Sequence, residues 1–161
     1  MRDKIIDRSV LKGIVAELQR AGKKVVFTNG CFDILHIGHL RYLEEARSLG
    51  DCLIVGLNTD DSVRRLKGPE RPFVSEDERA EMLAGFGCVD YVALFSEETA
   101  SELVSELRPD IYVIGGDYTP DRIPEARIVQ SYGGKAVIVP HVEGKSTTRL
   151  VSQIRTLGDE S

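Results

Sequence analysis

The stretch that decides the fold is TNGCFDILHIGH, residues 28–39. It follows a short apolar run at residues 25–27, which is typical of a buried strand, and it precedes a helical pattern that begins at Leu40. Two histidines, His36 and His39, therefore stand where a loop becomes a helix. The start of a helix offers unpaired N–H groups and the positive end of the helix dipole, which together attract anions. The stretch predicts a phosphate-binding site at this turn, with loop or N-cap roles for the histidines as the alternative.

Four further apolar runs follow along the chain, and helical patterns separate them. Each run is nearly continuous in apolar residues, as expected for strands that are buried on both faces of a sheet. Strands that alternate with helices predict an α/β fold: a Rossmann-like, doubly wound, five-stranded parallel sheet with helices on both faces. Ligands in such sheets bind at the carboxyl ends of the strands. The expected strands are residues 25–27, 53–57, 91–95, 111–114 and 136–139.

The length of 161 residues predicts a single domain. We expect an N-terminal helix within residues 1–22, capped by Ser9, then an α/β core over residues 23–157 and a tail over residues 158–161. A net charge of −5 argues against nucleic-acid binding by a basic face, and no run is long enough to cross a membrane. Three cysteines without a CxxC pair and the absence of a signal peptide predict reduced thiols in the cytoplasm.

Polar and basic residues follow the second expected strand. Asn58–Asp61 is expected to be a structural N-cap, and Arg64–Lys67 to be a basic run after a short turn. Lys67 stands before the Gly68-Pro69 loop, so its ammonium can reach bound phosphates; a solvated surface charge is the alternative. Further on, the pattern at Ser75–Glu78 predicts a capping box that opens the next helix.

Two later segments also come after expected strands. Gly116 and Asp117 follow the fourth strand, where a glycine lets a ligand approach the backbone, although a plain turn is the alternative. Residues 146–148 are Ser-Thr-Thr and place hydroxyl and N–H groups at the start of the last helix, where Ser146 also suits an N-cap. The preceding Gly-Lys is not part of a P-loop, because the first glycine of that motif is missing and the segment follows the last strand.

His36-Ile37-Gly38-His39 resembles the HxGH signature of the nucleotidyltransferases, and residues 29–36 resemble their cytidylyltransferase-like branch. This resemblance implies transfer of a nucleoside monophosphate from a nucleoside triphosphate, accompanied by Mg²⁺, to a phosphate acceptor, with release of pyrophosphate. It implies catalytic roles for His36, His39 and Lys67, and no metal site made of side chains. It implies nucleotide or phosphate binding by Thr28, Asn29, Gly30, Cys31, Phe32, Gly38, Gly116, Asp117, Ser146, Thr147 and Thr148.

From residue 25 to about residue 154, the chain resembles the heptose 1-phosphate adenylyltransferases, which share segments such as RLKGPERP and GGDYTPD. The resemblance implies AMP transfer from ATP to D-glycero-β-D-manno-heptose 1-phosphate. It also implies a sugar kinase, fused or separate, and leaves a homodimer open. Asp33 and Arg79 are weaker candidates for contact with the substrate. Ile114 stands where the group usually has lysine, which leaves the acceptor open.

Other functions remain as alternatives. A glycerol-3-phosphate cytidylyltransferase-like enzyme would use the same chemistry with CTP, and a non-catalytic regulator would only bind the nucleotide. A hydrolase with His36, His39 and Asp33 as metal ligands is disfavoured, because no further ligand cluster is evident. The chain is too short for a class I aminoacyl-tRNA synthetase and lacks a Lys-Met-Ser-Lys-Ser loop.

Overall fold

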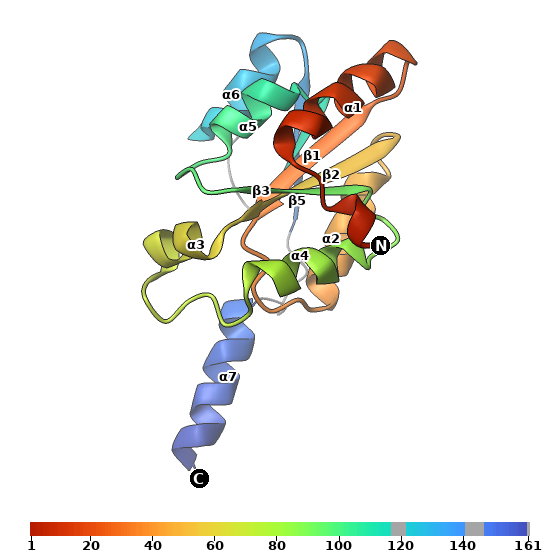
Figure 1. Ribbon diagram of the computed structural model, residues 1–161. Coiled ribbons are helices and arrows are strands. Elements are labelled where there is room, and N and C mark those ends of the chain that lie inside the picture. The colour runs from red at the N-terminus through yellow and green to blue at the C-terminus, as the bar shows by residue number, and fades with distance from the viewer. Residues whose placement is uncertain (117–121, 141–146, 161) are drawn as a thin grey trace.

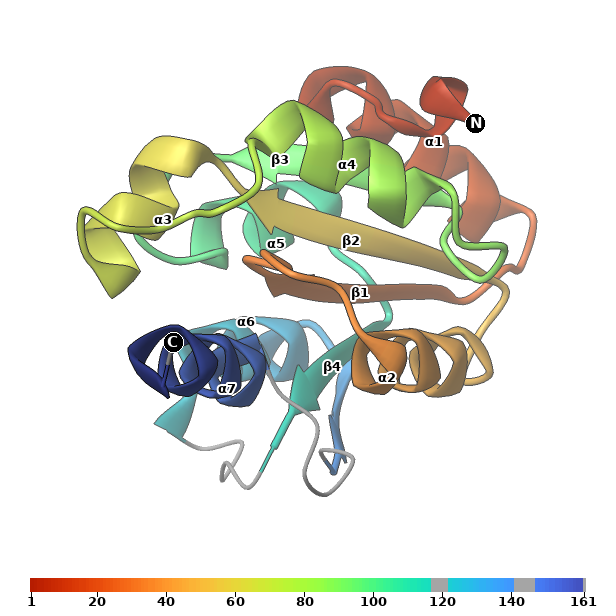
Figure 2. The ribbon, with the colours of Figure 1, turned by 90° about the horizontal axis from the view of Figure 1, so that it is seen from below.

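One parallel sheet organises the chain. The computed structural model describes residues 1–116, 122–140 and 147–160. Within these residues, five parallel strands lie in the order β3-β2-β1-β4-β5 (Figures 1 and 2), which confirms the expected sheet. The strands are β1 (Val25–Gly30), β2 (Cys52–Asn58), β3 (Tyr91–Phe95), β4 (Ile111–Gly115) and β5 (Lys135–Val139).

Helices cover both faces of this sheet, as expected. Helices α1, α5 and α6 lie on one face, and α2 and α4 lie on the other (Figure 1). The buried side chains of each group form a separate core with the sheet. A short 3₁₀ helix precedes α1, α3 follows β2, and α7 ends the described part of the chain. The helices are η1 (Arg2–Lys4), α1 (Arg8–Arg20), α2 (Ile37–Arg47), α3 (Asp60–Lys67), α4 (Glu76–Ala84), α5 (Ser101–Leu107), α6 (Pro124–Ser131) and α7 (Thr147–Glu160).

The central strand β1 joins two hydrophobic cores. Val25 and Phe27 belong to the core under α1 and α5, whereas Val26 belongs to the core under α2 and α4, because successive side chains of a strand point to opposite faces. All three are fully buried. Each such side chain contributes about 1.5–3 kcal/mol when it leaves water. The two cores therefore hold the end of β1 firmly, at the point where the histidine stretch begins.

The start of α1 differs from the expectation. Asp7 is the N-cap of this helix, and its carboxylate accepts a hydrogen bond from the Ser9 N–H at 2.9 Å. Ser9 was the expected cap, and that expectation is wrong: Ser9 is the second residue of the helix and supplies one of the N–H groups that the cap satisfies.

The basic run after β2 is part of a helix rather than a run after a short turn. Thr59 is the N-cap of α3 and accepts from the Ser62 N–H at 3.4 Å, which confirms the expected structural cap at residues 58–61. Acidic residues begin α3 and basic residues end it, an order that complements the helix dipole. Its apolar face is short, with Val63 as a buried apolar residue, so hydrophobic spacing gave little sign of it.

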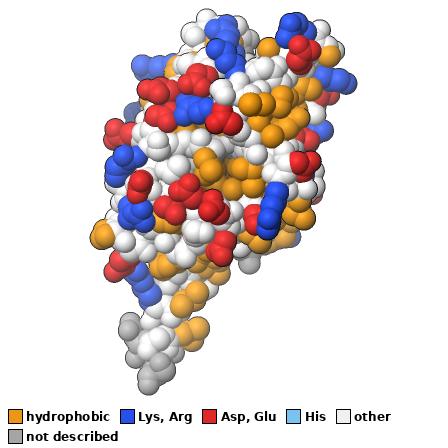
Figure 3. All heavy atoms as spheres, in the orientation of Figure 1, with side chains coloured by type: hydrophobic (Ala, Val, Ile, Leu, Met, Phe, Trp, Pro, Cys, Tyr) orange, Lys and Arg blue, Asp and Glu red, His pale blue; other side chains and the backbone are white. Residues whose placement is uncertain are grey.

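The last helix, α7, projects from the body of the molecule (Figure 1). Its later apolar side chains are exposed, with Ile154 at 63% and Leu157 at 66%. No helix among the described residues has both the length and the apolar character needed to span a membrane. On the face that Figure 3 shows, acidic and basic side chains are interspersed and neither sign dominates.

Candidate active site

The site residues gather where the strand order reverses. From β1 the chain proceeds to β2 and β3 on one side, and it later returns to β4 and β5 on the other. The carboxyl end of β1, Gly30, therefore lies at the topological switch point, which is where open parallel sheets bind their ligands. The histidine stretch begins in this strand and leads directly into α2.

His36 and His39 form the N-terminal cap of α2. His36 is the N-cap residue, and its Nδ1 accepts a hydrogen bond from the Gly38 N–H at 3.0 Å. The Nδ1 atom of His39 accepts from the His36 N–H at 3.2 Å, which completes a reciprocal capping box. Because Nδ1 is an acceptor in both rings, each neutral ring carries its proton on Nε2. The N-cap interpretation is thus correct for His36, and it leaves the expected phosphate contact to the opposite edge of each ring.

Gly30 and Phe32 fix the orientation of these rings. The two imidazole centroids are 3.9 Å apart, and the Phe32 ring meets the His39 ring edge-on at 5.5 Å. A Cβ at Gly30 would lie 3.0 Å from the Phe32 ring, so a side chain there would crowd this packing. Phe32 itself has a φ of 45°, a left-handed conformation that is uncommon for a bulky residue. Local strain of this kind is tolerated where the surrounding structure holds it in place.

Thr28 and Asn29 make hydrogen bonds within the protein: those of Thr28 join β1 to α2 and to β4, and that of Asn29 joins β1 to β4. The Thr28 hydroxyl lies 2.7 Å from the Tyr42 hydroxyl and donates to the Val113 carbonyl at 3.0 Å. The Tyr112 hydroxyl donates to the side-chain oxygen of Asn29. Burial raises the pKa of Tyr42 to about 12, so its hydroxyl stays protonated in this network at neutral pH. In this structure the side chains of Thr28 and Asn29, both expected nucleotide contacts, support neighbouring elements through these hydrogen bonds.

The charge of Lys67 influences Cys31, which lies in the loop before α2. Lys67 is the last residue of α3, its side chain is exposed, and the helix ends at Gly68, whose φ of 103° suits glycine. Burial raises the pKa of the Cys31 thiol, and the positive charges of Lys67, Arg79 and Arg71 oppose that rise. The charge of Lys67 therefore acts to lower the pKa of a residue in the histidine loop. Cys31 therefore remains a thiol, which argues against a role as a nucleophile.

Asp33 and Arg79, the weaker substrate candidates, are buried and bonded to protein groups. The Asp33 side chain is 1% exposed and accepts from Arg71 Nε at 2.7 Å and from the Phe73 and Val74 N–H groups at 2.9 Å. Burial pushes its pKa upward, but these hydrogen bonds outweigh burial and place the pKa of Asp33 below its usual value. The Arg79 side chain is fully buried in the same region. Both groups are thus engaged by protein partners and have a supporting role in this arrangement.

The remaining candidates follow β4 and β5. Gly116 is buried with a φ of 105°, and its N–H donates to the Val139 carbonyl at 3.1 Å, so this turn requires glycine. Ile114, which replaces the usual lysine, is 7% exposed and packs in the core under α5 and α6. Asp117 and Ser146 lie outside the described residues. Thr147 and Thr148 begin α7, and the structure describes their backbone but not their side chains.

A cavity of about 790 Å³ lies beside the Asp33 loop, next to α4. Its lining is largely apolar and includes Leu35, Met82 and Phe86. Arg79 also lines it, but the guanidinium of Arg79 donates to protein acceptors. Among the described residues, no group of three or more metal-ligating side chains comes together. The hydrolase alternative required Asp33 as a metal ligand together with His36 and His39. The Asp33 carboxylate instead accepts hydrogen bonds from Arg71 and from backbone N–H groups, which counts against that alternative.

Sequence comparison finds a family model and curated relatives that match most of this chain. A family model described as cytidylyltransferase-like matches residues 27–156, a range that includes both histidines and Lys67. The "Bifunctional protein HldE" of Trichlorobacter lovleyi is 54% identical over 151 residues, which are 94% of this chain and 31% of that protein. The protein of the same name from Geobacter sulfurreducens is 49% identical over 158 residues, which are 98% of this chain and 32% of that protein. The chain therefore spans less than a third of the length of these curated relatives.

A solved structure is also similar. The lipopolysaccharide core biosynthesis protein from Thermoplasma volcanium matches with a TM-score of 0.61 and 32% sequence identity. The match covers 77% of this chain and all of that one. The likeness thus extends over a complete chain of similar architecture.

Proposed function

The chain belongs to the cytidylyltransferase-like family, and on that premise we propose that it transfers AMP from ATP to a sugar phosphate, D-glycero-β-D-manno-heptose 1-phosphate, giving ADP-heptose and pyrophosphate. The observation that carries the proposal is the histidine capping box at the switch point of the sheet. It turns a helix start into an anion site and adds two imidazole donors to it.

The residues present suit this reaction because the attacking group is a phosphate oxygen that is already anionic. No strong base and no covalent nucleophile is needed, so catalysis consists of alignment and of neutralising the charge that develops. His36 and His39 donate from Nε2 to oxygens of the transferred phosphate region. Lys67, at the end of α3, neutralises the departing pyrophosphate. Thr147 and Thr148 begin α7, and the N–H groups of this second helix start bind the phosphates.

Mg²⁺ enters this proposal as a companion of the triphosphate. The described side chains form no cage of their own for an ion. Mg²⁺ commonly keeps several waters and binds through substrate phosphates, so such a cage is not required. When bound, the ion would reduce the negative charge of the triphosphate.

The acceptor and the partners rest on the resemblance of the whole chain. The relatives from two bacterial species are named as bifunctional proteins, and this chain matches less than a third of each. We assign the other function to a sugar kinase that makes the acceptor. The proposal places the reaction in the cytoplasm, which fits the free state of Cys31, Cys52 and Cys88.

Pyrophosphate release tests the proposal directly. The protein is supplied with Mg²⁺ and with ATP or CTP, each crossed with heptose 1-phosphate or glycerol 3-phosphate. Release that requires ATP and the heptose supports the full proposal. Release with CTP and glycerol 3-phosphate would retain the mechanism and replace the substrates, and nucleotide binding without release in any combination would indicate a regulator.

A further inference from the structure

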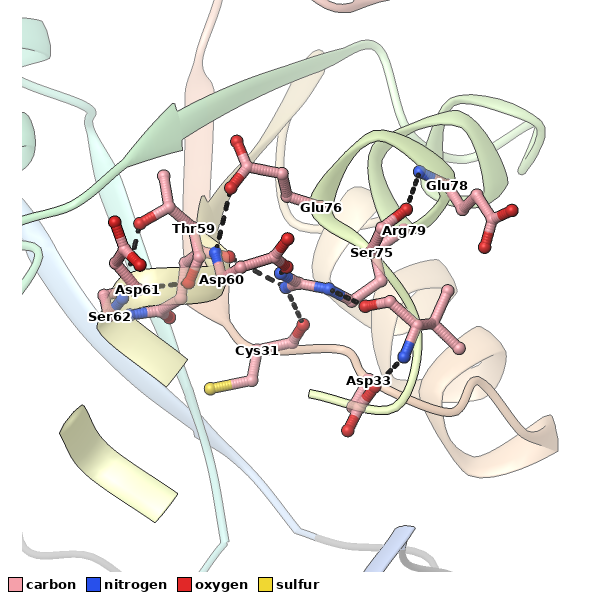
Figure 4. Close-up of polar contacts among 12 residues, drawn as sticks. Cys31, Asp33, Thr59, Asp60, Asp61, Ser62, Ser75, Glu76, Glu78 and Arg79 are labelled. Carbon is pink, nitrogen blue, oxygen red and sulfur yellow. Dashed lines mark hydrogen bonds and ion pairs between the residues drawn. The ribbon is translucent and has the colours of Figure 1, made fainter. Parts of the chain in front are cut away.

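Arg79 is a fully buried cation whose guanidinium donates to four acceptors, which lie in the histidine loop, at the junction of β2 and α3, and just before α4 (Figure 4). It extends from α4, and its Nη1 donates to the Cys31 carbonyl at 2.7 Å and to the Asn58 carbonyl at 2.8 Å. Its Nε donates to the Val74 carbonyl at 2.9 Å, and its Nη2 donates to the Asp60 carboxylate at 2.7 Å. A buried charge without hydrogen-bond partners costs several kcal/mol, so the folded protein strongly favours the arrangement in which all four bonds are made.

Three of the four acceptors belong to the parts of the site that hold the catalytic candidates, and the fourth, Val74, lies in the segment before α4. Cys31 lies in the loop that leads to His36, and Asn58 ends β2. Asp60 is the first residue of α3, which carries Lys67 at its other end. A single guanidinium thus touches both the histidine loop and the base of the helix that bears the lysine.

Asp33 makes a second connection in the opposite direction. It extends from the histidine loop to the segment before α4, where it binds Arg71 and the N–H groups of Phe73 and Val74. Val74 is therefore held from both sides, through its N–H by Asp33 and through its carbonyl by Arg79. The Glu76 carboxylate adds a bond from the Asp60 N–H at 3.0 Å, which ties the start of α4 to the start of α3.

We propose that Arg79 is a positioning residue for the nucleotidyl transfer: it sets the placement of α3, and hence of Lys67, relative to the histidine loop. This inference rests on the proposed function and assigns to the site a residue that touches no substrate. An arginine suits the task because its planar fork reaches several acceptors in fixed directions, whereas a lysine presents one nitrogen. Displacements of about 1 Å in catalytic geometry can reduce rates by about 10²-fold, so the fork matters to the reaction as well as to the fold.

A double-mutant cycle separates positioning from general stability. Arg79→Lys keeps the charge and removes the fork, and it is measured in the wild-type and Lys67→Ala backgrounds below the melting temperature of each variant. We expect a fall in kcat of about 10-fold in the wild-type background and of less than about 2-fold when Lys67 is absent, because the positioned group is then gone. Equal losses in the two backgrounds, or no loss, would overturn the proposal. Arg64→Lys, the same substitution at an exposed arginine of α3, is the matched control and leaves kcat unchanged.

Amide hydrogen exchange without substrate tests the connection independently of activity. In Arg79→Lys we expect faster exchange over residues 31–39 and 60–67 together, with α5 unchanged as an internal reference. Uniformly faster exchange throughout the chain, or unchanged exchange in either segment, would contradict the connecting role. A wild-type protein that releases no pyrophosphate would count against the proposed function, while the exchange result would still decide whether Arg79 holds the two segments.

Discussion

The starts of α2 and α4 perform the same structural task with different chemistry. At α4 the Ser75 hydroxyl accepts from the Glu78 N–H at 3.4 Å, which is an ordinary N-cap. At α2 the acceptors are the Nδ1 atoms of His36 and His39. Histidine is not among the preferred N-cap residues, yet here two of them complete a capping box. The difference teaches that the cap of α2 does two things. Each imidazole accepts a hydrogen bond through Nδ1 and carries a donor at Nε2 on its opposite edge, which a serine cannot supply.

The largest expected effect comes from separating the two edges of His36. His36→Asn keeps a side-chain oxygen that can cap α2 and removes the imidazole donor. We expect turnover to fall by about 10²–10³-fold, as for the loss of one preorganised donor. The free energy of unfolding should change by less than about 0.5 kcal/mol, since asparagine is a good N-cap.

The matched variant is His36→Ala, which removes the cap and the donor together. It should lose the same activity and a further 0.5–2 kcal/mol or so of stability, measured by denaturant unfolding. An asparagine variant that retains wild-type turnover would show that His36 is only a cap.

The next effect concerns Lys67, the cation at the end of α3. Lys67→Ala should lower kcat/KM by about 10²-fold, because the charge that develops on the leaving pyrophosphate loses its partner. Arg64→Ala removes an exposed charge from the same helix and should leave kcat/KM within about 2-fold of wild type, as exposed ion pairs contribute little. Steady-state kinetics on both variants compare the two cations, and equal losses would indicate a general field effect instead of a positioned lysine.

A smaller effect should appear at the connection between the two helix starts. Asp33 accepts from the residues just before the α4 cap, so Asp33→Asn should cost about 2–3 kcal/mol of stability at pH 7, as expected for hydrogen bonds to a charged group. The pKa of Asp33 is lowered in the folded protein. Its contribution is therefore present above the unfolded pKa of about 3.9 and is lost as pH falls through the folded value.

Urea unfolding of the wild type and of Asp33→Asn at a series of pH values measures this linkage. The difference between the two proteins should shrink as the pH falls through the acidic range. A difference that stays constant with pH would mean that the charge of Asp33 is not what stabilises the connection.

The smallest effect is predicted at α4 itself. Ser75→Ala removes an ordinary cap and should reduce the free energy of unfolding by about 1 kcal/mol, with kcat unchanged within about 2-fold. Thermal melting and pyrophosphate release on the same samples check both quantities. A loss of activity comparable to that of His36→Asn would remove the distinction between the two helix starts.

Much of this arrangement could be predicted from the sequence, because strong local patterns specify it. Five apolar runs identified the strands. The length of β1 was underestimated because its last three residues, Thr28, Asn29 and Gly30, are polar or small. The two histidines were expected at the start of α2, and they lie there. The identity of the α1 cap and the existence of α3 were missed, since neither depends on a long apolar stripe.

The supporting contacts could not be predicted, because they join distant segments. Arg79 meets Cys31 across 48 residues, and Asp33 meets Val74 across 41. Asp33 was assigned to the substrate because it lies inside the histidine stretch, and Arg79 because a cation early in a helix suggests a nearby anion. An arginine early in a helix, where the dipole disfavours a cation, was the one local sign that Arg79 has a special environment.

The central claim is that one pair of side chains caps a helix through Nδ1 and holds phosphate through Nε2. Nitrogen-15 NMR of the His36 and His39 rings, before and after addition of ATP with Mg²⁺, tests it most directly. The account predicts unprotonated Nδ1 and protonated Nε2 in both rings, with the Nε2 resonances shifting on nucleotide addition. Protonated Nδ1 in the free protein, or Nε2 resonances that do not respond to saturating nucleotide, would contradict it.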